Sequence, residues 1–166
     1  MIIHNLVNTL GEAHSFATTD VGDGDIMAVL EAARLAPSAM NSQIWRFFVV
    51  RIEEKRDQLA RIAGEPAFLT APVVIAACAA PYFLTRRGRE QPYFMIDVPI
   101  AVTHLMLRAV ELGLESAWTF EFDEDEALSV ICAPERYRAV ALVSLGYAKE
   151  RVMNTDPGES HTVEIR

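Results

Sequence analysis

The sequence lacks any uninterrupted apolar run of about 18 residues, the length that a helix needs to cross a membrane. The longest candidate, APVVIAACAAPYF at positions 71–83, is shorter and is bounded by prolines. The first residues, MIIHNLVNTLGEA, also lack the basic segment and the small-residue cleavage site of a secretion signal. These absences predict a cytoplasmic protein without a membrane span.

Cysteine is scarce, since Cys78 and Cys132 are the only two in the chain. Both lie in apolar stretches, and their spacing matches neither a metal-ligand motif nor a redox motif. We therefore expect two buried free thiols in a reducing compartment, and no metal site.

Excess positive charge is missing too, because 15 Lys and Arg residues stand against 23 Asp and Glu residues, for a net charge of −8. Such a chain repels the phosphates of nucleic acids and of anionic membranes. The charge therefore argues against nucleic acid and membrane as partners.

Apolar residues, in contrast, are abundant: they make up 51% of the 166 residues, although only 8% are aromatic. The length suits a single domain over 1–166, with an N-terminal arm at 1–15 and a polar tail at 149–166. The apolar excess predicts either a large core or a further face that a partner subunit covers.

Helical and strand patterns alternate along the chain. Apolar spacing and charged faces predict helices at 26–36, 53–64, 96–113 and 123–133, and a short helix or arm at 1–10. Continuous apolar runs predict strands at 46–52, 72–79, 114–120 and 139–148, and residues 81–94 form a loop or lid flanked by two aromatic pairs. This order favours a layered α/β or α+β domain.

The segment DVGDGD at 20–25 allows two interpretations. Its carboxylates suggest calcium, but the alternating positions are Asp23, Asp25 and Met27, so the third ligand is missing. We favour a loop in which Asp25 caps a helix that starts at Ile26.

The predicted helix at 96–113 is polar mainly along one narrow stripe of His104, Arg108 and Glu111. A helix that is apolar on most sides is buried on most sides, which favours a central position, with a twin helix in a dimer as one source of cover. Pro99 is expected in its first turn. His104 is either a proton donor near a substrate or a structural residue, and His14 and His161 are weaker candidates.

The stretch APSAMNSQIWRF at 36–47 places turn-forming and amide residues between two apolar segments. One interpretation is a turn in which Asn41 and Gln43 satisfy the local backbone. The other is a binding site for a ligand with mixed hydrogen-bonding groups.

The longer stretch EAARLAPSAMNSQIWRFFVV at 31–50 resembles the nitroreductase-like flavoprotein family, in which a helix ends in a Pro-Ser-x-x-Asn-x-Gln-Pro-Trp segment before a strand. Tyr93 and Asp97 at the head of a long apolar helix, ELGLESAWTFEF and ALVSLGYA continue the resemblance over about residues 16–148.

This resemblance implies an α+β fold with a central, mostly antiparallel sheet flanked by helices, in an intertwined homodimer. It implies one FMN at each end of the dimer interface, and hydride transfer by a ping-pong route from NAD(P)H to a small-molecule acceptor such as a nitroaromatic or a quinone. The flavin carries that chemistry, so no catalytic side chain is assigned.

The resemblance also assigns binding residues. Pro37, Ser38 and Ala39 would approach the flavin, the two amides would bond its ring, and the backbone at 119–121 would pass its N5. The implied cofactor-binding residues are Pro37, Ser38, Ala39, Asn41, Gln43, Thr119, Phe120, Glu121, Lys149 and Arg151.

The sequence departs from the family at the phosphate end. The usual Arg-Arg-Ser falls on Leu10, Gly11 and Glu12, or on His14-Ser15 in a looser alignment, so its arginines are absent. Lys149, Arg151, the distant Arg166 or the basic loop of Arg86, Arg87 and Arg89 could replace them. The alternative function is a family member that has lost tight FMN binding and serves as a flavin- or small-ligand-binding or partner protein.

Overall fold

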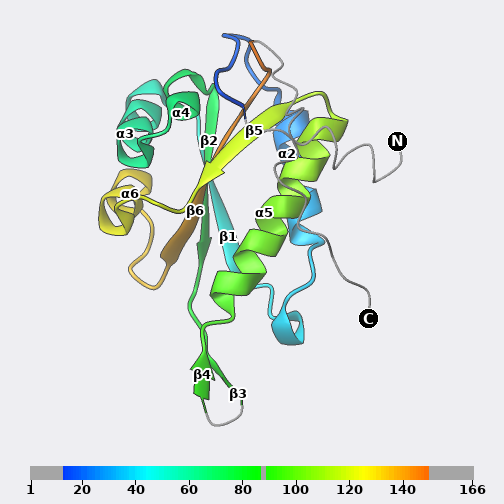
Figure 1. Cartoon of the computed structure of the whole chain (residues 1–166), viewed down its shortest axis with the longest axis vertical. Helices are drawn as coiled ribbons and strands as arrows, with labels where there is room; N and C mark the ends of the chain where they lie inside the picture. Colours follow the sequence, from blue (N-terminus) through cyan, green and yellow to red (C-terminus); the bar gives the residue numbers. More distant parts are fainter. Residues whose placement is uncertain (1–12, 87–88, 150–166) are drawn as a thin grey trace, which may run out of the picture.

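A computed structural model describes residues 13–86 and 89–149 (Figure 1). Its helices are α2 (Asp23–Arg34), α3 (Glu53–Ala63), α4 (Pro66–Thr70), α5 (Phe94–Glu111) and α6 (Glu124–Ile131), with a short 3₁₀ turn, η1 (Ala39–Asn41). Its strands are β1 (Trp45–Val50), β2 (Val73–Ala79), β3 (Leu84–Arg86), β4 (Arg89–Gln91), β5 (Glu115–Thr119) and β6 (Arg138–Gly146).

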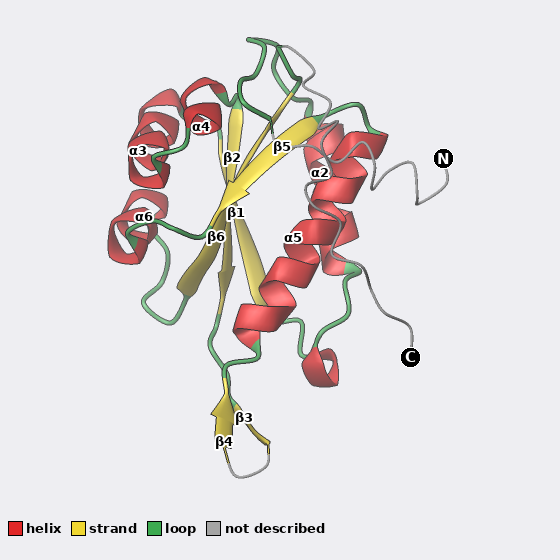
Figure 2. Cartoon of the chain, in the orientation of Figure 1, coloured by secondary structure: helices red, strands yellow, loops and turns green. Residues whose placement is uncertain are grey.

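The central sheet has four strands in the order β1-β2-β6-β5, and every neighbouring pair is antiparallel. The expected α+β class with an antiparallel sheet is therefore confirmed. Helices α2 and α5 cover one face, and α3, α4 and α6 cover the other (Figure 2). This arrangement explains why β2 is buried along its whole length, as its unbroken apolar sequence predicts.

Strand alternation divides the core into two parts. Ile75 and Ala77 of β2 pack toward α2 and α5, whereas Val74, Ala76 and Cys78 pack toward the other helices. A register shift between Ala77 and Cys78 marks a bulge in the pairing of β2 with β6. The sheet is therefore a rigid, double-sided support for the loops at its ends.

Several local predictions are confirmed. Helix α3 ends at Gly64, which adopts a left-handed φ of 69°. The helix predicted at 123–133 is present as α6, and the structure adds that Asp123 caps it, because its side chain accepts a hydrogen bond of 2.9 Å from the backbone N of Glu126. Cys78 is fully buried, and this burial raises the pKa of its thiol to about 12.

Other predictions are wrong. Cys132 is exposed, because it lies just past the last buried residue of α6 and ends that helix with a φ of 53°. Asp25 is not a cap, since α2 starts at Asp23 after Gly22. Helix α5 starts at Phe94, so Pro99 lies in its second turn rather than its first, where its ring removes one helical hydrogen bond.

Two elements went unpredicted. The short helix α4 begins two residues after Gly64, and the β3–β4 hairpin lies inside the segment predicted as a loop. The predicted arm at 1–10 lies outside the described residues. No helix in the described part of the chain is both long and apolar enough to span a membrane.

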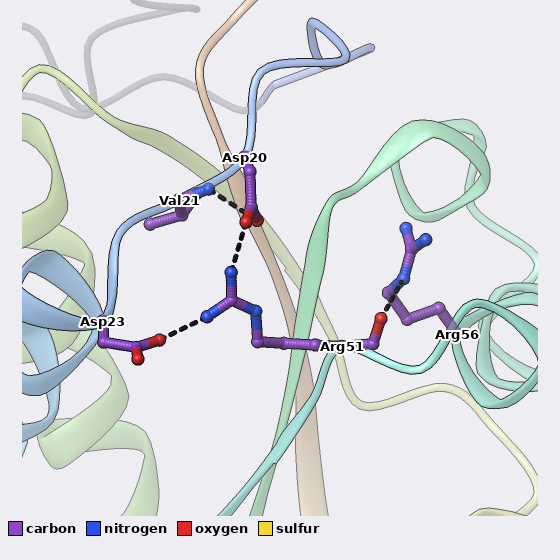
Figure 3. A network of polar contacts seen from close by, with 5 residues as sticks. All are labelled: Asp20, Val21, Asp23, Arg51 and Arg56. Carbon is purple, nitrogen blue, oxygen red and sulfur yellow. Dashed lines mark hydrogen bonds and ion pairs between the residues drawn. The ribbon is translucent and has the colours of Figure 1, made fainter.

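The carboxylates of the DVGDGD segment bind an arginine. Figure 3 shows Arg51, which follows β1, between Asp20 and Asp23, with both carboxylates bonded to its guanidinium. Arg56 of α3 donates in turn to the carbonyl of Arg51, at 3.2 Å. These contacts tie the start of α2 to the end of β1.

Candidate functional site

The connection between α2 and β1 has an unusual backbone. Met40, Asn41 and Gln43 have φ values of 53°, 55° and 45°, in the left-handed region that favours glycine. Such a conformation costs a residue with a Cβ about 1–2 kcal/mol. Elsewhere in the described residues, Cys132 is the only non-glycine with a positive φ. Strain of this kind concentrates at functional sites, so this turn is the first candidate.

A buried carboxylate holds the turn. Asp97, in the first turn of α5, is only 2% exposed, and its Oδ1 accepts a hydrogen bond of 3.0 Å from the backbone N of Ala39. Its Oδ2 accepts from the hydroxyl of Tyr82 at 2.9 Å and lies 3.5 Å from the hydroxyl of Ser42. The carboxylate therefore contacts both ends of η1.

Tyr82 completes this network. Its hydroxyl accepts a hydrogen bond of 3.1 Å from the Ser42 hydroxyl. Burial and the neighbouring Asp97 carboxylate raise the pKa of Tyr82, and this outweighs the lowering effect of Ser42. Tyr82 thus stays protonated at neutral pH and keeps donating to Asp97.

The amide side chains of the turn point to solvent. Asn41 and Gln43 are exposed, and neither amide makes a hydrogen bond within the described residues. The local backbone is satisfied by other groups: the Ser38 hydroxyl accepts from the backbone N of Gln43 at 3.0 Å, and Asp97 binds Ala39. The two amides are therefore available to a ligand, contrary to the interpretation in which they serve the turn itself.

The predicted residues at 119–121 lie at the other edge of the sheet. They lie at the end of β5 and just after it, whereas the strained turn precedes β1, and β1 and β5 are the two edge strands. Thr119 is buried and its hydroxyl accepts from the backbone N of Glu121 at 3.2 Å. Phe120 is 61% exposed, and its ring meets Trp118 edge-on at 5.0 Å. The structure does not bring the two predicted sets together within one chain.

The predicted phosphate end is partly described. Lys149 is exposed, and its backbone N donates to the carbonyl of Ser15 at 3.2 Å, beside a bridge between Phe16 and Ala148. The looser alignment on His14-Ser15 thus lies next to a predicted cation. Several predicted residues fall outside the described ranges: Leu10, Gly11, Glu12, Arg87, Arg151, His161 and Arg166.

In the segment predicted as a lid, residues 81–94, aromatic side chains near its start contact aromatic side chains at its end. Tyr82 stacks on Tyr93 with ring centroids 6.5 Å apart, and Phe83 meets Phe94 edge-on at 6.0 Å. Between them the β3–β4 hairpin projects beyond the end of the main sheet (Figure 1). The two aromatic pairs noted in the sequence are therefore in contact with each other.

The polar residues of α5 and the groove between α3 and α6 add nothing to this candidate site. His104 is half-buried on α5 and makes no hydrogen bond within the described ranges, and Arg108 pairs with Glu111 on the same helix. A groove of about 700 Å³ between α3 and α6 contains none of the predicted site residues. Among the residues that the structure describes, no group of three or more His, Cys, Asp or Glu could hold a metal ion.

Sequence reasoning missed how the turn is supported. The sequence points to Asp97 only through the family resemblance, and it assigns no role to Tyr82 or Ser42. A signal was present, because Asp97 is an acid between Ile96 and Val98 at the head of an apolar helix. A buried acid needs hydrogen-bond donors, so its partners could have been sought among nearby turns.

Known proteins match this chain over most of its length. The Nitroreductase family model matches residues 14–67 and 63–147. A protein of Archaeoglobus fulgidus that carries the name NADH dehydrogenase/NAD(P)H nitroreductase is 30% identical over 152 residues, 87% of this chain and 84% of that protein.

Solved structures agree on the fold. A nitroreductase family protein from Clostridium novyi NT is 26% identical with a TM-score of 0.82, covering 90% of this chain and 87% of that one. An FMN-dependent nitroreductase from Clostridium difficile R20291 is 22% identical with a TM-score of 0.81, covering 96% of each chain. The expected nitroreductase fold is confirmed, and the chain is an oxidoreductase of the nitroreductase family.

Proposed function

We propose that this chain binds FMN and transfers hydride from NAD(P)H to an electrophilic acceptor such as a nitroaromatic or a quinone. The observation that carries the proposal is the strained turn with its two exposed amides, which bond to none of the residues 13–86 and 89–149. The names of two related proteins, an NAD(P)H nitroreductase and an FMN-dependent nitroreductase, support the choice of cofactor and reductant.

The residues of the turn fit the ring of a flavin. The isoalloxazine edge alternates carbonyl acceptors and ring nitrogens, and the amides of Asn41 and Gln43 each offer both donors and an acceptor. Pro37, Ser38 and Ala39 would bring backbone groups to the same ring. Bound FMN would supply the hydride chemistry, while these residues bind and orient it.

The phosphate of FMN needs cations, which we assign to the C-terminal end of the domain. Lys149 is the exposed cation next to Ser15, and Arg151 follows two positions later in the sequence. Lysine and arginine both bind phosphate, so these two residues can replace the arginines that the sequence lacks at 10–12.

We further propose that the site is completed by a second copy of the chain. The strands that carry the two segments, β1 and β5, are separated across the sheet by three strand spacings, roughly 14 Å in total. Exposed apolar side chains on the same chain, including Met40, Phe83, Ile96 and Phe120, suit burial against a partner. A homodimer would let the turn of one copy face residues 119–121 of the other.

The second candidate function is a flavin- or small-ligand-binding protein that lacks tight FMN binding. It is favoured by the absence of arginine at positions 10–12. This candidate predicts that the purified protein does not retain FMN.

A visible spectrum separates the two candidates. Protein purified without added flavin should be yellow, with close to one FMN per chain, and should oxidise NADH or NADPH when a quinone or nitroaromatic is supplied. Protein that is colourless and remains so after titration with FMN would refute the proposal. Mass analysis of the extracted ligand would identify riboflavin if it replaces FMN.

A further inference from the structure

The carboxylate of Asp97 is buried among apolar residues. Its neighbours on α5, Phe94, Val98 and Ala101, all belong to the core, and Asp97 itself is 2% exposed. A carboxylate in such a place is unfavourable unless donors satisfy it. The position of Asp97 therefore depends on the groups that bond to it.

Those donors come from two other segments of the chain. The backbone N of Ala39 bonds to Oδ1, whereas Tyr82 bonds to Oδ2 and Ser42 lies beside it. Ala39 and Ser42 are the first and the last residue of the tightly turned stretch, and the residues with positive φ between them are Met40 and Asn41. One carboxylate thus bonds to residues on both sides of Met40 and Asn41, and the third strained residue, Gln43, follows Ser42 directly.

Helix α5 gives this carboxylate a rigid base. It is 18 residues long, and one side of it is buried from end to end against the sheet and α2. Groups bonded to Asp97 are therefore held in place relative to the sheet. A supporting residue of this kind sets the accuracy with which a binding group is presented.

We propose that Asp97 is a positioning residue that holds turn 39–43 in its strained form and so presents the amides of Asn41 and Gln43 to the flavin. This role rests on the proposed function for the identity of the ligand. The hydrogen bonds by which Asp97 holds the turn, here called the clamp, are a property of the chain without ligand. Asp97 touches no reacting group, and it acts through the turn.

The variant Asp97→Asn tests the clamp. The amide keeps the size of the carboxylate but offers one acceptor oxygen, so either the backbone N–H of Ala39 or the hydroxyl of Tyr82 loses its acceptor at position 97. In the full chain without FMN, hydrogen–deuterium exchange of the peptide that contains residues 39–43 should speed up at least about tenfold. The Kd for FMN, measured by quenching of flavin fluorescence, should rise by about tenfold or more.

A matched control is Glu124→Gln. Glu124 is also a carboxylate that accepts from a backbone N, that of Ala139 at 3.0 Å, and it binds Arg138, but it lies on α6. This variant should lower the Tm while leaving exchange at 39–43 and the Kd for FMN within about twofold of the original values. The variant Tyr82→Phe removes one donor only and should give an intermediate increase in exchange.

The outcomes are distinguishable. Unchanged exchange at 39–43 in Asp97→Asn would overturn the clamp, whatever FMN does. Faster exchange with an unchanged Kd would overturn the role in binding while leaving the clamp in place. If the unmodified chain binds no FMN, the proposed function and the assignment to a flavin fail together. Hydrogen–deuterium exchange at residues 39–43 then remains as the test of the clamp.

Discussion

Two turns of this molecule reach the left-handed region in different ways. At the end of α3, Gly64 takes a φ of 69°, and its N–H bonds to the carbonyl of Ala60, one helical turn earlier. After α2, Met40, Asn41 and Gln43 take similar angles without a glycine, and Asp97 and Tyr82 hold the turn from far along the chain. The first turn costs little conformational free energy, because glycine accepts a left-handed φ, and its hydrogen bond is local. The second is costly and needs tertiary support, which is the pattern expected of a functional site.

The largest effect is expected in the scaffold, at Gly146. A Cβ there would lie 2.7 Å from Cδ of Pro72 and 2.9 Å from Cδ1 of Phe16, and the proline ring cannot turn away. Gly146→Ala should therefore lower the free energy of unfolding by about 3 kcal/mol in a urea titration. Gly24→Ala is the control, since nothing lies within 4 Å of its added Cβ. Equal stability of the two variants would contradict the tight packing at the end of β6.

A smaller effect, confined to binding, is expected at Asn41. Because its side chain is exposed and bonds to no other residue in the described part of the chain, Asn41→Ala should weaken FMN binding about tenfold while changing the unfolding free energy by less than about 1 kcal/mol. Asn41→Asp is the matched variant, because it keeps the tolerance of left-handed φ and removes the amide donors. Fluorescence titration and thermal unfolding measure the two quantities. Loss of folding without loss of affinity in the folded fraction would return Asn41 to a turn-forming role.

At Gly64, in contrast to Asn41, a substitution is expected to lower stability and leave FMN binding unchanged. Gly64→Ala places a Cβ in a left-handed turn and should cost about 1 kcal/mol of stability. The Kd for FMN should stay the same, because Gly64 belongs to the other face of the sheet. A change in that Kd would show that the two turns are coupled, and the contrast between them would then be lost.

The smallest effect is expected at Met40, which is 82% exposed and has a φ of 53°. Met40→Gly should relieve strain, offset in part by the greater freedom of glycine in the unfolded chain, for a net stabilisation of about 0.5 kcal/mol. The flavin should bind less tightly because the turn is less well ordered. Destabilisation in thermal unfolding would indicate that the Met40 side chain is packed, as it would be against a second copy.

Much of the fold was predictable because it depends on local pattern. The apolar run of β2, the capping residue Asp123 and the terminal Gly64 each act within a few residues of their own position. The failed predictions concern features that leave no clear local pattern in the sequence. Helix α4 is only five residues long, too short for a periodic signal, and the exposure of Cys132 depends on where α6 ends against the sheet.

By itself, the sequence determined the order of the longer helices and strands, a layered α/β or α+β class and the resemblance carried by residues 36–47, which implied the antiparallel sheet. Periodicity and short motifs contain that information because they act over one or two turns of backbone. Only the tertiary structure decided that Asp97 bonds to Ala39, a residue 58 positions away, and that the residues predicted to share a flavin lie at opposite edges of the sheet. Such pairings follow from how α5 packs on the sheet, and packing depends on the whole chain at once.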